Sequence, residues 1–97
     1  MRFERTRDDG ICMARLQGKA VRILSRQGGE RFRPDARRPR RELKKLLQEH
    51  GVPPWQRERL PLLWCGEELV WCPGIGIDCA WQCRKGEAGL LPVWIQQ

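Results

Sequence analysis

Eight basic side chains fall within fifteen residues of the chain, and clustered cations of this kind can bind phosphates. From residue 31 to residue 45 they stand against two acidic residues, which gives a local balance of +6, whereas residues 1–30 contribute +3 and residues 46–97 contribute −2. Clustered Arg and Lys bind a nucleic-acid backbone by releasing its condensed counterions. The stretch therefore indicates a nucleic-acid-binding face, with a solvated basic face that has no partner as the alternative. The candidate phosphate ligands are Arg31, Arg33, Arg37, Arg38, Arg40, Arg41, Lys44 and Lys45.

The segment before this basic stretch has the alternating pattern of a β-strand. In residues 19–26, apolar side chains occupy one face, and Arg22 and Arg26 lie on the other. Gln27-Gly28-Gly29 then predicts a turn into a second strand over residues 30–33, so we expect a β-hairpin with arginines on its outer face. The two glycines could instead form a backbone nest that binds an anion.

A short helix is predicted after a proline-rich surface linker over residues 34–40. In residues 41–50, Leu43, Leu46, Leu47 and His50 form one apolar stripe, and the basic side chains lie on the opposite face. Gly51 suits the left-handed position that ends a helix, with Val52 packing back on Leu47 and two prolines preventing continuation. His50 is expected to cap the helix or to lie at the edge of the core.

Pro53-Pro54-Trp55 opens a second, very short helix that ends by Leu60. We expect Trp55 to be buried as the packing partner of the Pro-Pro turn; the alternative is a base-stacking role beside arginines. The arginines of this turn are expected to point outward. The rim of the nucleic-acid-binding face is thus predicted to consist of Arg22, Arg26, Arg57 and Arg59.

The C-terminal half is apolar and has the pattern of successive strands. Turn signals at Gly66-Glu67 and Pro73-Gly74 separate three strand candidates, each of which carries a tryptophan expected in the core: Trp64, Trp71 and Trp81. A last strand over residues 90–95 is expected at a sheet edge, because Pro92 cannot donate to a ladder. The fold class predicted is α+β: an N-terminal β-hairpin, one short basic helix plus a helical turn, and a mixed or antiparallel C-terminal sheet.

The length of 97 residues sets limits on function. It suffices for one modest core, but a doubly wound nucleotide-binding domain with a substrate site needs several successive strand-helix units. We therefore expect no catalytic residues and no enzyme activity from the chain alone. No apolar run approaches the length of a membrane span and the first residues lack a secretory signal, so the cytoplasm is the expected location.

Five cysteines raise the question of disulfides or zinc, which their spacing disfavours. Their number is odd, no Cys-x-x-Cys pair exists, and His50 is the single histidine. We expect no metal site, and we expect Cys65, Cys72 and Cys79 to fill the core as small apolar side chains. A small freestanding thiol or metal protein remains an alternative class, which predicts bound zinc or a cysteine of low pKa.

Several of these motifs occur in an order that resembles a known family. RQGGERFRP, RRELKKLLQEHGVPPWQRERLPLLWCGEELVW and PGIGI follow one another as in the C-terminal domain of bacterial tRNA(Ile)-lysidine synthetase. The resemblance runs from about residue 20 to the end. It implies domain limits of 19–97 for a tRNA-binding domain, after a lead-in segment of residues 1–18 that carries no motif.

The resemblance also implies a function. Enzymes of that family use ATP and lysine to modify the wobble cytidine of a minor isoleucine tRNA. Their catalytic N-terminal domain carries a Ser-Gly-Gly-x-Asp-Ser phosphate loop, whereas Gly28-Gly29 here lies between Gln27 and Glu30. This chain is therefore expected to hold no cofactor itself and to have tRNA and the parent enzyme's catalytic domain as partners, with a homodimer through that enzyme left open.

In that family the C-terminal domain helps to recognise the acceptor stem of the tRNA, which agrees with the basic face deduced from charge. The alternative function is a structural or protein-interaction module whose basic face meets an acidic partner domain. That alternative predicts no salt-sensitive affinity for tRNA.

Overall fold

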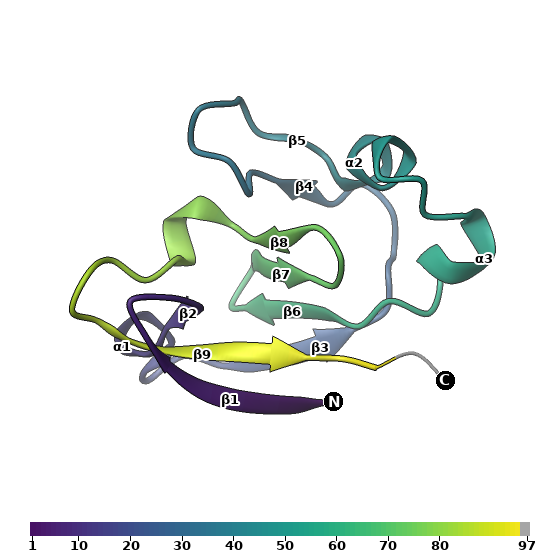
Figure 1. Ribbon diagram of the computed structural model, residues 1–97. Coiled ribbons are helices and arrows are strands. Elements are labelled where there is room, and N and C mark those ends of the chain that lie inside the picture. Colours follow the sequence, from purple (N-terminus) through teal and green to yellow (C-terminus); the bar gives the residue numbers. More distant parts are fainter. Residues whose placement is uncertain (96–97) are drawn as a thin grey trace.

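The computed structural model describes residues 1–95 and contains three antiparallel sheets joined by short helices (Figure 1). The molecule measures 37 × 31 × 22 Å, with a radius of gyration of 13.0 Å. This arrangement confirms the predicted α+β class. The sheets have the strand orders β1-β9-β2, β3-β6-β7-β8 and β4-β5. Their strands are β1 Arg2–Arg7, β2 Ile11–Cys12, β3 Val21–Leu24, β4 Arg31–Phe32, β5 Arg41–Glu42, β6 Leu62–Cys65, β7 Glu68–Cys72, β8 Gly76–Ile77 and β9 Ala88–Val93.

The pairing of the arginine-bearing strands differs from the prediction. The hairpin of the N-terminal half joins β4 to β5, with Phe32 opposite Arg41, and not β3 to β4. β3 pairs instead with β6, with Arg22 opposite Trp64. Residues 25–30 therefore connect two sheets, and residues 33–40 form the loop of the hairpin. β6 and β7 turn at Gly66-Glu67, and the chain turns again at Pro73-Gly74 before β8, as predicted.

β9 is a central strand, so the prediction of an edge strand was wrong. It pairs with β1 along its whole length and with β2 at Gly89 and Leu90. Pro92 is tolerated because β2 ends before it, which leaves Pro92 with a strand neighbour on one side only. The pattern of β9 could not reveal this arrangement, because both of its partners lie more than 70 residues away in the sequence.

Two clusters of buried side chains form the core. One packs the helix face of Leu43, Leu46 and Leu47 against Phe32 and the strands of the C-terminal half. The other contains Ile11, Trp71 and Trp81. Trp71 and Trp81 are buried as predicted, although Trp81 lies in a 3-10 turn, η1 (Cys79–Trp81), and not in a strand.

The remaining predicted core residues are only partly confirmed. Trp64 is half-buried at the side of the first cluster. Cys65 and Cys72 are buried as predicted, but Cys79 is half-buried at the start of η1, where Trp81 is the buried residue. All five thiols are free. Burial raises the pKa of the Cys72 thiol to about 12, which keeps it protonated.

Three short helices complete the fold: α1 Met13–Leu16, α2 Leu43–Glu49 and α3 Pro54–Arg57. α2 begins two residues later than predicted, because Arg41 and Glu42 pair with β4. It ends as predicted: Gly51 has φ +71°, its N–H donates to the carbonyl of Gln48, and the N–H of Val52 donates to that of Leu47. These two bonds define a Schellman motif, which fixes the direction of the chain leaving α2.

The prediction that Trp55 is buried was wrong. Its side chain is 71% exposed at the start of α3. The Pro-Pro corner is held by other contacts, namely the Schellman motif and a hydrogen bond of 2.7 Å from Nε of Arg57 to the carbonyl of Val52. That bond also turns Arg57 inward, so its predicted outward orientation was wrong as well.

Candidate nucleic-acid interface

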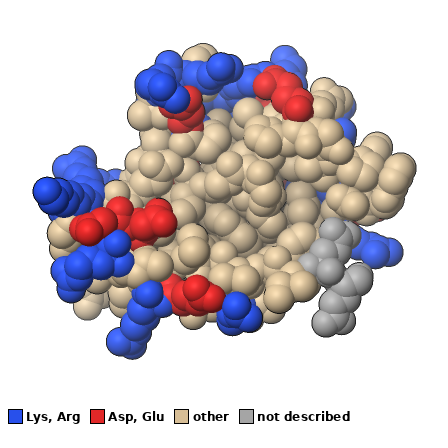
Figure 2. Space-filling model, viewed as in Figure 1, with Lys and Arg blue, Asp and Glu red and all other residues tan. Residues whose placement is uncertain are grey.

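The β4–β5 hairpin and α2 together form a continuous basic surface, which we call the hairpin–helix surface and define as residues 31–49. Figure 1 shows the hairpin and α2 side by side at the top of the molecule. Figure 2 shows Lys and Arg side chains along the same edge, with acidic groups between them. Leu43, Leu46 and Leu47 face the core, so the polar side of α2 is directed away from it, as predicted.

Arg33 shapes the hairpin loop and has little left to offer a ligand. Its guanidinium donates to the carbonyl of Arg38 at 2.7 Å and to that of Ala36 at 2.5 Å. These bonds fold the loop back on the side chain at its base. Arg33 is therefore a structural residue, although its charge still contributes to the local field.

Asp78 anchors the hairpin to the rest of the fold. It is 2% exposed, and its carboxylate accepts hydrogen bonds of 3.0 Å from the backbone N–H groups of Arg33 and Ala80. Arg40 approaches the same carboxylate at 3.7 Å. The backbone N–H of Cys79 donates to the carbonyl of Arg33 at 2.8 Å. The loop position is thus set by a buried acid next to η1.

Two other predicted ligands are engaged in ion pairs. Arg41 forms a two-pronged pair with Glu49 on α2, and this hydrogen bonding lowers the pKa of Glu49. Arg37 pairs with Asp35 within the loop at 3.1 Å, which lowers the pKa of Asp35 for the same reason. Both pairs lie in solvent, where an ion pair contributes little stability, so a phosphate can compete for either arginine.

Most of the rim also has internal partners. Arg22 donates to the carbonyl of Gly66 at 3.1 Å, Arg26 lies 3.7 Å from Glu30, and Arg57 is held as described above. Arg31, at the base of the hairpin, donates to the carbonyl of Arg40 at 3.2 Å. Within residues 1–95, four of the twelve candidates make neither a hydrogen bond nor an ion pair through their side chains: Arg38, Lys44, Lys45 and Arg59.

The loop between β3 and β4 holds a carboxylate with the backbone N–H groups of Gln27 and Gly28, much as the alternative of a backbone nest predicts, but this carboxylate belongs to the protein. Gly28 and Gly29 both have positive φ, at +97° and +79°. The carboxylate of Glu30 accepts from the backbone N–H of Gln27 at 2.7 Å and from that of Gly28 at 3.1 Å. Because Glu30 is buried at 6% exposure, this loop is closed by its own side chain.

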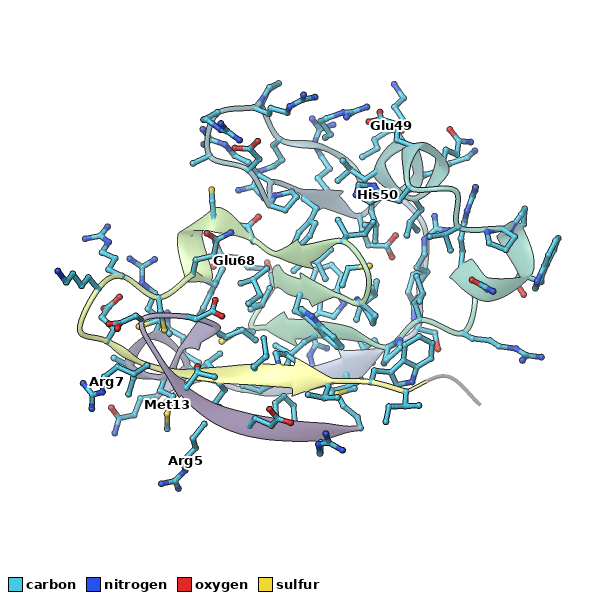
Figure 3. The ribbon with its side chains drawn as sticks, viewed as in Figure 1. Arg5, Arg7, Met13, Glu49, His50 and Glu68 are labelled. Carbon is cyan, nitrogen blue, oxygen red and sulfur yellow. The ribbon has the colours of Figure 1, made fainter. Side chains whose placement is uncertain are left out.

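A cavity of about 410 Å³ lies between the hairpin loop and the end of α2. Phe32, Leu46 and Ile75 contribute its apolar lining, and Arg38 and His50 its polar lining. His50 is exposed and does not extend the apolar stripe of α2, so that part of the prediction was wrong. It is the C-cap residue of α2 (Figure 3), as expected, and its Nδ1 lies 2.8 Å from the carbonyl oxygen of Leu46.

Sequence reasoning gave no role to a second group of cations at the opposite end of the molecule. Arg5 and Arg7 lie on β1, at the bottom of Figure 3, and Arg84 and Lys85 lie in the loop before β9. Acidic residues are mixed with them: Asp8 accepts from the backbone N–H of Gly86, and Glu87 from that of Arg84. Arg5 and Arg7 lie far from Arg84 and Lys85 in the sequence, so no short segment has a high net charge that would indicate this group.

The described residues were also compared with the requirements of a metal site and of a membrane-spanning helix. Within residues 1–95, no group of three or more His, Cys, Asp or Glu side chains is placed to hold a metal ion. In the same part of the chain, no helix has the length and apolar character needed to cross a membrane.

Fold and surface together define a small α+β domain with a basic hairpin and helix on one side. The chain belongs to the TilS substrate C-terminal domain family, whose model matches residues 21–94. This confirms the family that the sequence resembles.

Several relatives are named tRNA(Ile)-lysidine synthase, and three of them illustrate the similarity to this chain. The protein of Nitrosomonas europaea is 54% identical over 94 residues, which cover 97% of this chain and 20% of that protein. That of an Azoarcus species is 49% identical over 80% of this chain and 19% of its own length. That of Aromatoleum aromaticum is 42% identical over 97% of this chain and 22% of its own length. The chain spans about a fifth of the length of these relatives.

Proposed function

We propose that this domain binds tRNA through the hairpin–helix surface and presents it to the catalytic part of a tRNA(Ile)-lysidine synthase. In that role it serves an ATP- and lysine-dependent modification of isoleucine tRNA in the cytoplasm. The observation that carries the proposal concerns the four candidate cations whose side chains make no hydrogen bond or ion pair within residues 1–95. Three of them lie on the hairpin–helix surface: Arg38, Lys44 and Lys45. The family membership, together with relatives named tRNA(Ile)-lysidine synthase, supports tRNA as the polyanion.

The mode of binding follows from the chemistry of this surface. Duplex RNA has a narrow major groove that side chains do not read, so a basic surface contacts mainly phosphates and 2′-hydroxyls. Lys44 and Lys45 are adjacent on α2 and exposed, and Arg38 projects from a loop fixed by Arg33 and Asp78. A surface of this kind recognises the shape of an acceptor stem and contributes little base discrimination.

We propose that the domain leaves the modification chemistry to the rest of the synthase. The glycine loop at Gly28-Gly29, which most resembles a phosphate loop, is filled by Glu30. We therefore propose that the chain alone does not transfer lysine to tRNA. Incorporation of labelled lysine into isoleucine tRNA by the isolated chain, above a blank without protein, would contradict this.

The salt dependence of tRNA affinity tests the proposal. Each phosphate contact contributes roughly −0.7 to −0.9 to the slope of log affinity against log salt, so four contacts give a slope of about −3 to −4. A salt titration of tRNA binding by fluorescence anisotropy measures it. Absence of binding at low salt would refute the proposal and favour the interaction-module alternative.

A further inference from the structure

Trp55 is an aromatic side chain that the fold exposes without using it for packing. The other four tryptophans, Trp64, Trp71, Trp81 and Trp94, are buried or half-buried against the two core clusters. Trp55 is 71% exposed, and α3, which carries it, consists of residues that are exposed or half-buried. An exposed indole contributes little hydrophobic stabilisation to the fold, because its large apolar surface stays in water. A ligand that covers the ring would recover this stabilisation.

The backbone beneath Trp55 is fixed on both sides. On one side, the Schellman motif at Gly51 and Val52 closes α2. On the other side, Arg57 donates through Nε to the carbonyl of Val52, across the Pro-Pro corner. A rigid corner presents an aromatic ring at little cost in conformational entropy, because the ring has few free torsions to lose on binding.

The surroundings of Trp55 favour RNA over a protein partner. Its sequence neighbours in α3 and the following turn are Gln56, Glu58 and the cation Arg59, and before it only Pro54 adds an exposed apolar side chain. The exposed apolar surface along this segment is therefore short. A protein interface needs a contiguous apolar core with a polar rim, whereas a nucleobase needs one aromatic face and a nearby cation for its phosphate. α3, which carries Trp55, follows α2 directly in the chain and lies on the same side of the molecule (Figure 1), so the hairpin–helix surface continues along the chain into α3.

From this geometry we infer that Trp55 stacks on an unpaired base next to the RNA duplex, with Arg59 contacting the adjoining phosphate. The occupant is a single-stranded nucleotide that extends from the end of a stem. This inference rests on the proposed binding of a tRNA stem by α2 and the hairpin. Stacking tolerates any base, so the contact senses the presence of an unpaired end and not its sequence.

Two RNA hairpins of the same stem separate this inference from the proposed function, one blunt and one with a four-nucleotide 3′ overhang. Base–aromatic stacking contributes a factor of roughly 5 to 150 in affinity per base. We expect wild-type protein to bind the overhang hairpin tighter than the blunt one by a factor in that range. Trp55→Leu, which stays apolar but has no aromatic face, should remove the difference, and the matched variant Trp55→Phe should keep most of it.

The possible results distinguish the stacking of Trp55 from the binding of the RNA stem. Equal wild-type affinity for the two hairpins would overturn the stacking inference and leave the proposed function standing, since the blunt stem still binds. Equal weakening of both hairpins by Trp55→Leu would also overturn it, because Trp55 would then contact the duplex. Failure of wild type to bind either hairpin at low salt would refute the proposed function and the inference with it.

Discussion

Asp78 is the residue whose loss should most disturb the placement of the basic hairpin. Its buried carboxylate holds the backbone N–H groups of Arg33 and Ala80, and it attracts Arg40 from 3.7 Å. Hydrogen bonds to a charged group contribute about 1.5–3 kcal/mol each when buried, and both donors here are only partly buried. We therefore expect Asp78→Ala to lower the free energy of unfolding by ~2–4 kcal/mol.

Thermal denaturation followed by circular dichroism measures this effect. For a domain of this size, 1 kcal/mol corresponds to about 4–8 °C, so Tm should fall by about 10–30 °C. Asp78→Asn keeps one acceptor oxygen and should lie between wild type and Asp78→Ala. Glu68→Ala removes an exposed carboxylate from β7 and serves as the control, with an expected change within about 0.5 kcal/mol (Figure 3). A Tm for Asp78→Ala within a few degrees of wild type would refute the anchoring role.

Three further outcomes follow from other residues. Gly51→Ala meets no steric obstacle but must adopt φ +71°, so it should cost about 1 kcal/mol in a denaturant titration. Cys72, whose pKa is raised to about 12, should resist alkylation at pH 8 in the native protein and react after unfolding, as mass spectrometry would show. Glu49→Gln should release Arg41 and tighten tRNA binding. Because Arg41 lowers the pKa of Glu49, their pair forms above the ordinary carboxyl pKa and breaks only as the pH falls through the lowered value. Acid should therefore release Arg41 in wild type, and a neutral-pH affinity for Glu49→Gln no tighter than wild type would contradict this.

Local signals in the sequence predicted local structure well. The end of α2 at Gly51, with Val52 packing back, follows from backbone rules that act over a few residues. Strand partners could not be predicted in this way. β3 pairs with β6, which lies about 40 residues further along the chain, and β4 pairs with β5, so the glycine loop that Glu30 fills joins separate sheets.

The candidate site shows a similar limit. Charge density correctly marked a basic stretch, but it could not distinguish an arginine directed to solvent from one bound to a carbonyl. Arg33 and Lys44 count equally in the sequence, yet Arg33 holds its own loop and Lys44 has an exposed side chain on α2. Trp55 was misassigned because the Pro-Pro corner was expected to need the indole, while Arg57 supplies the contact instead.

The salt slopes of two double variants test most directly the claim that the hairpin–helix surface binds tRNA. Lys44→Ala with Lys45→Ala removes two cations from that surface. Arg5→Ala with Lys85→Ala removes the same charge from β1, at the bottom of Figure 3, and from the loop before β9. If the claim holds, the first variant shallows the slope of log affinity against log salt by about 1.4–1.8, and the second leaves it unchanged. Equal slopes for the two variants would show that net charge alone, and not this surface, attracts the tRNA.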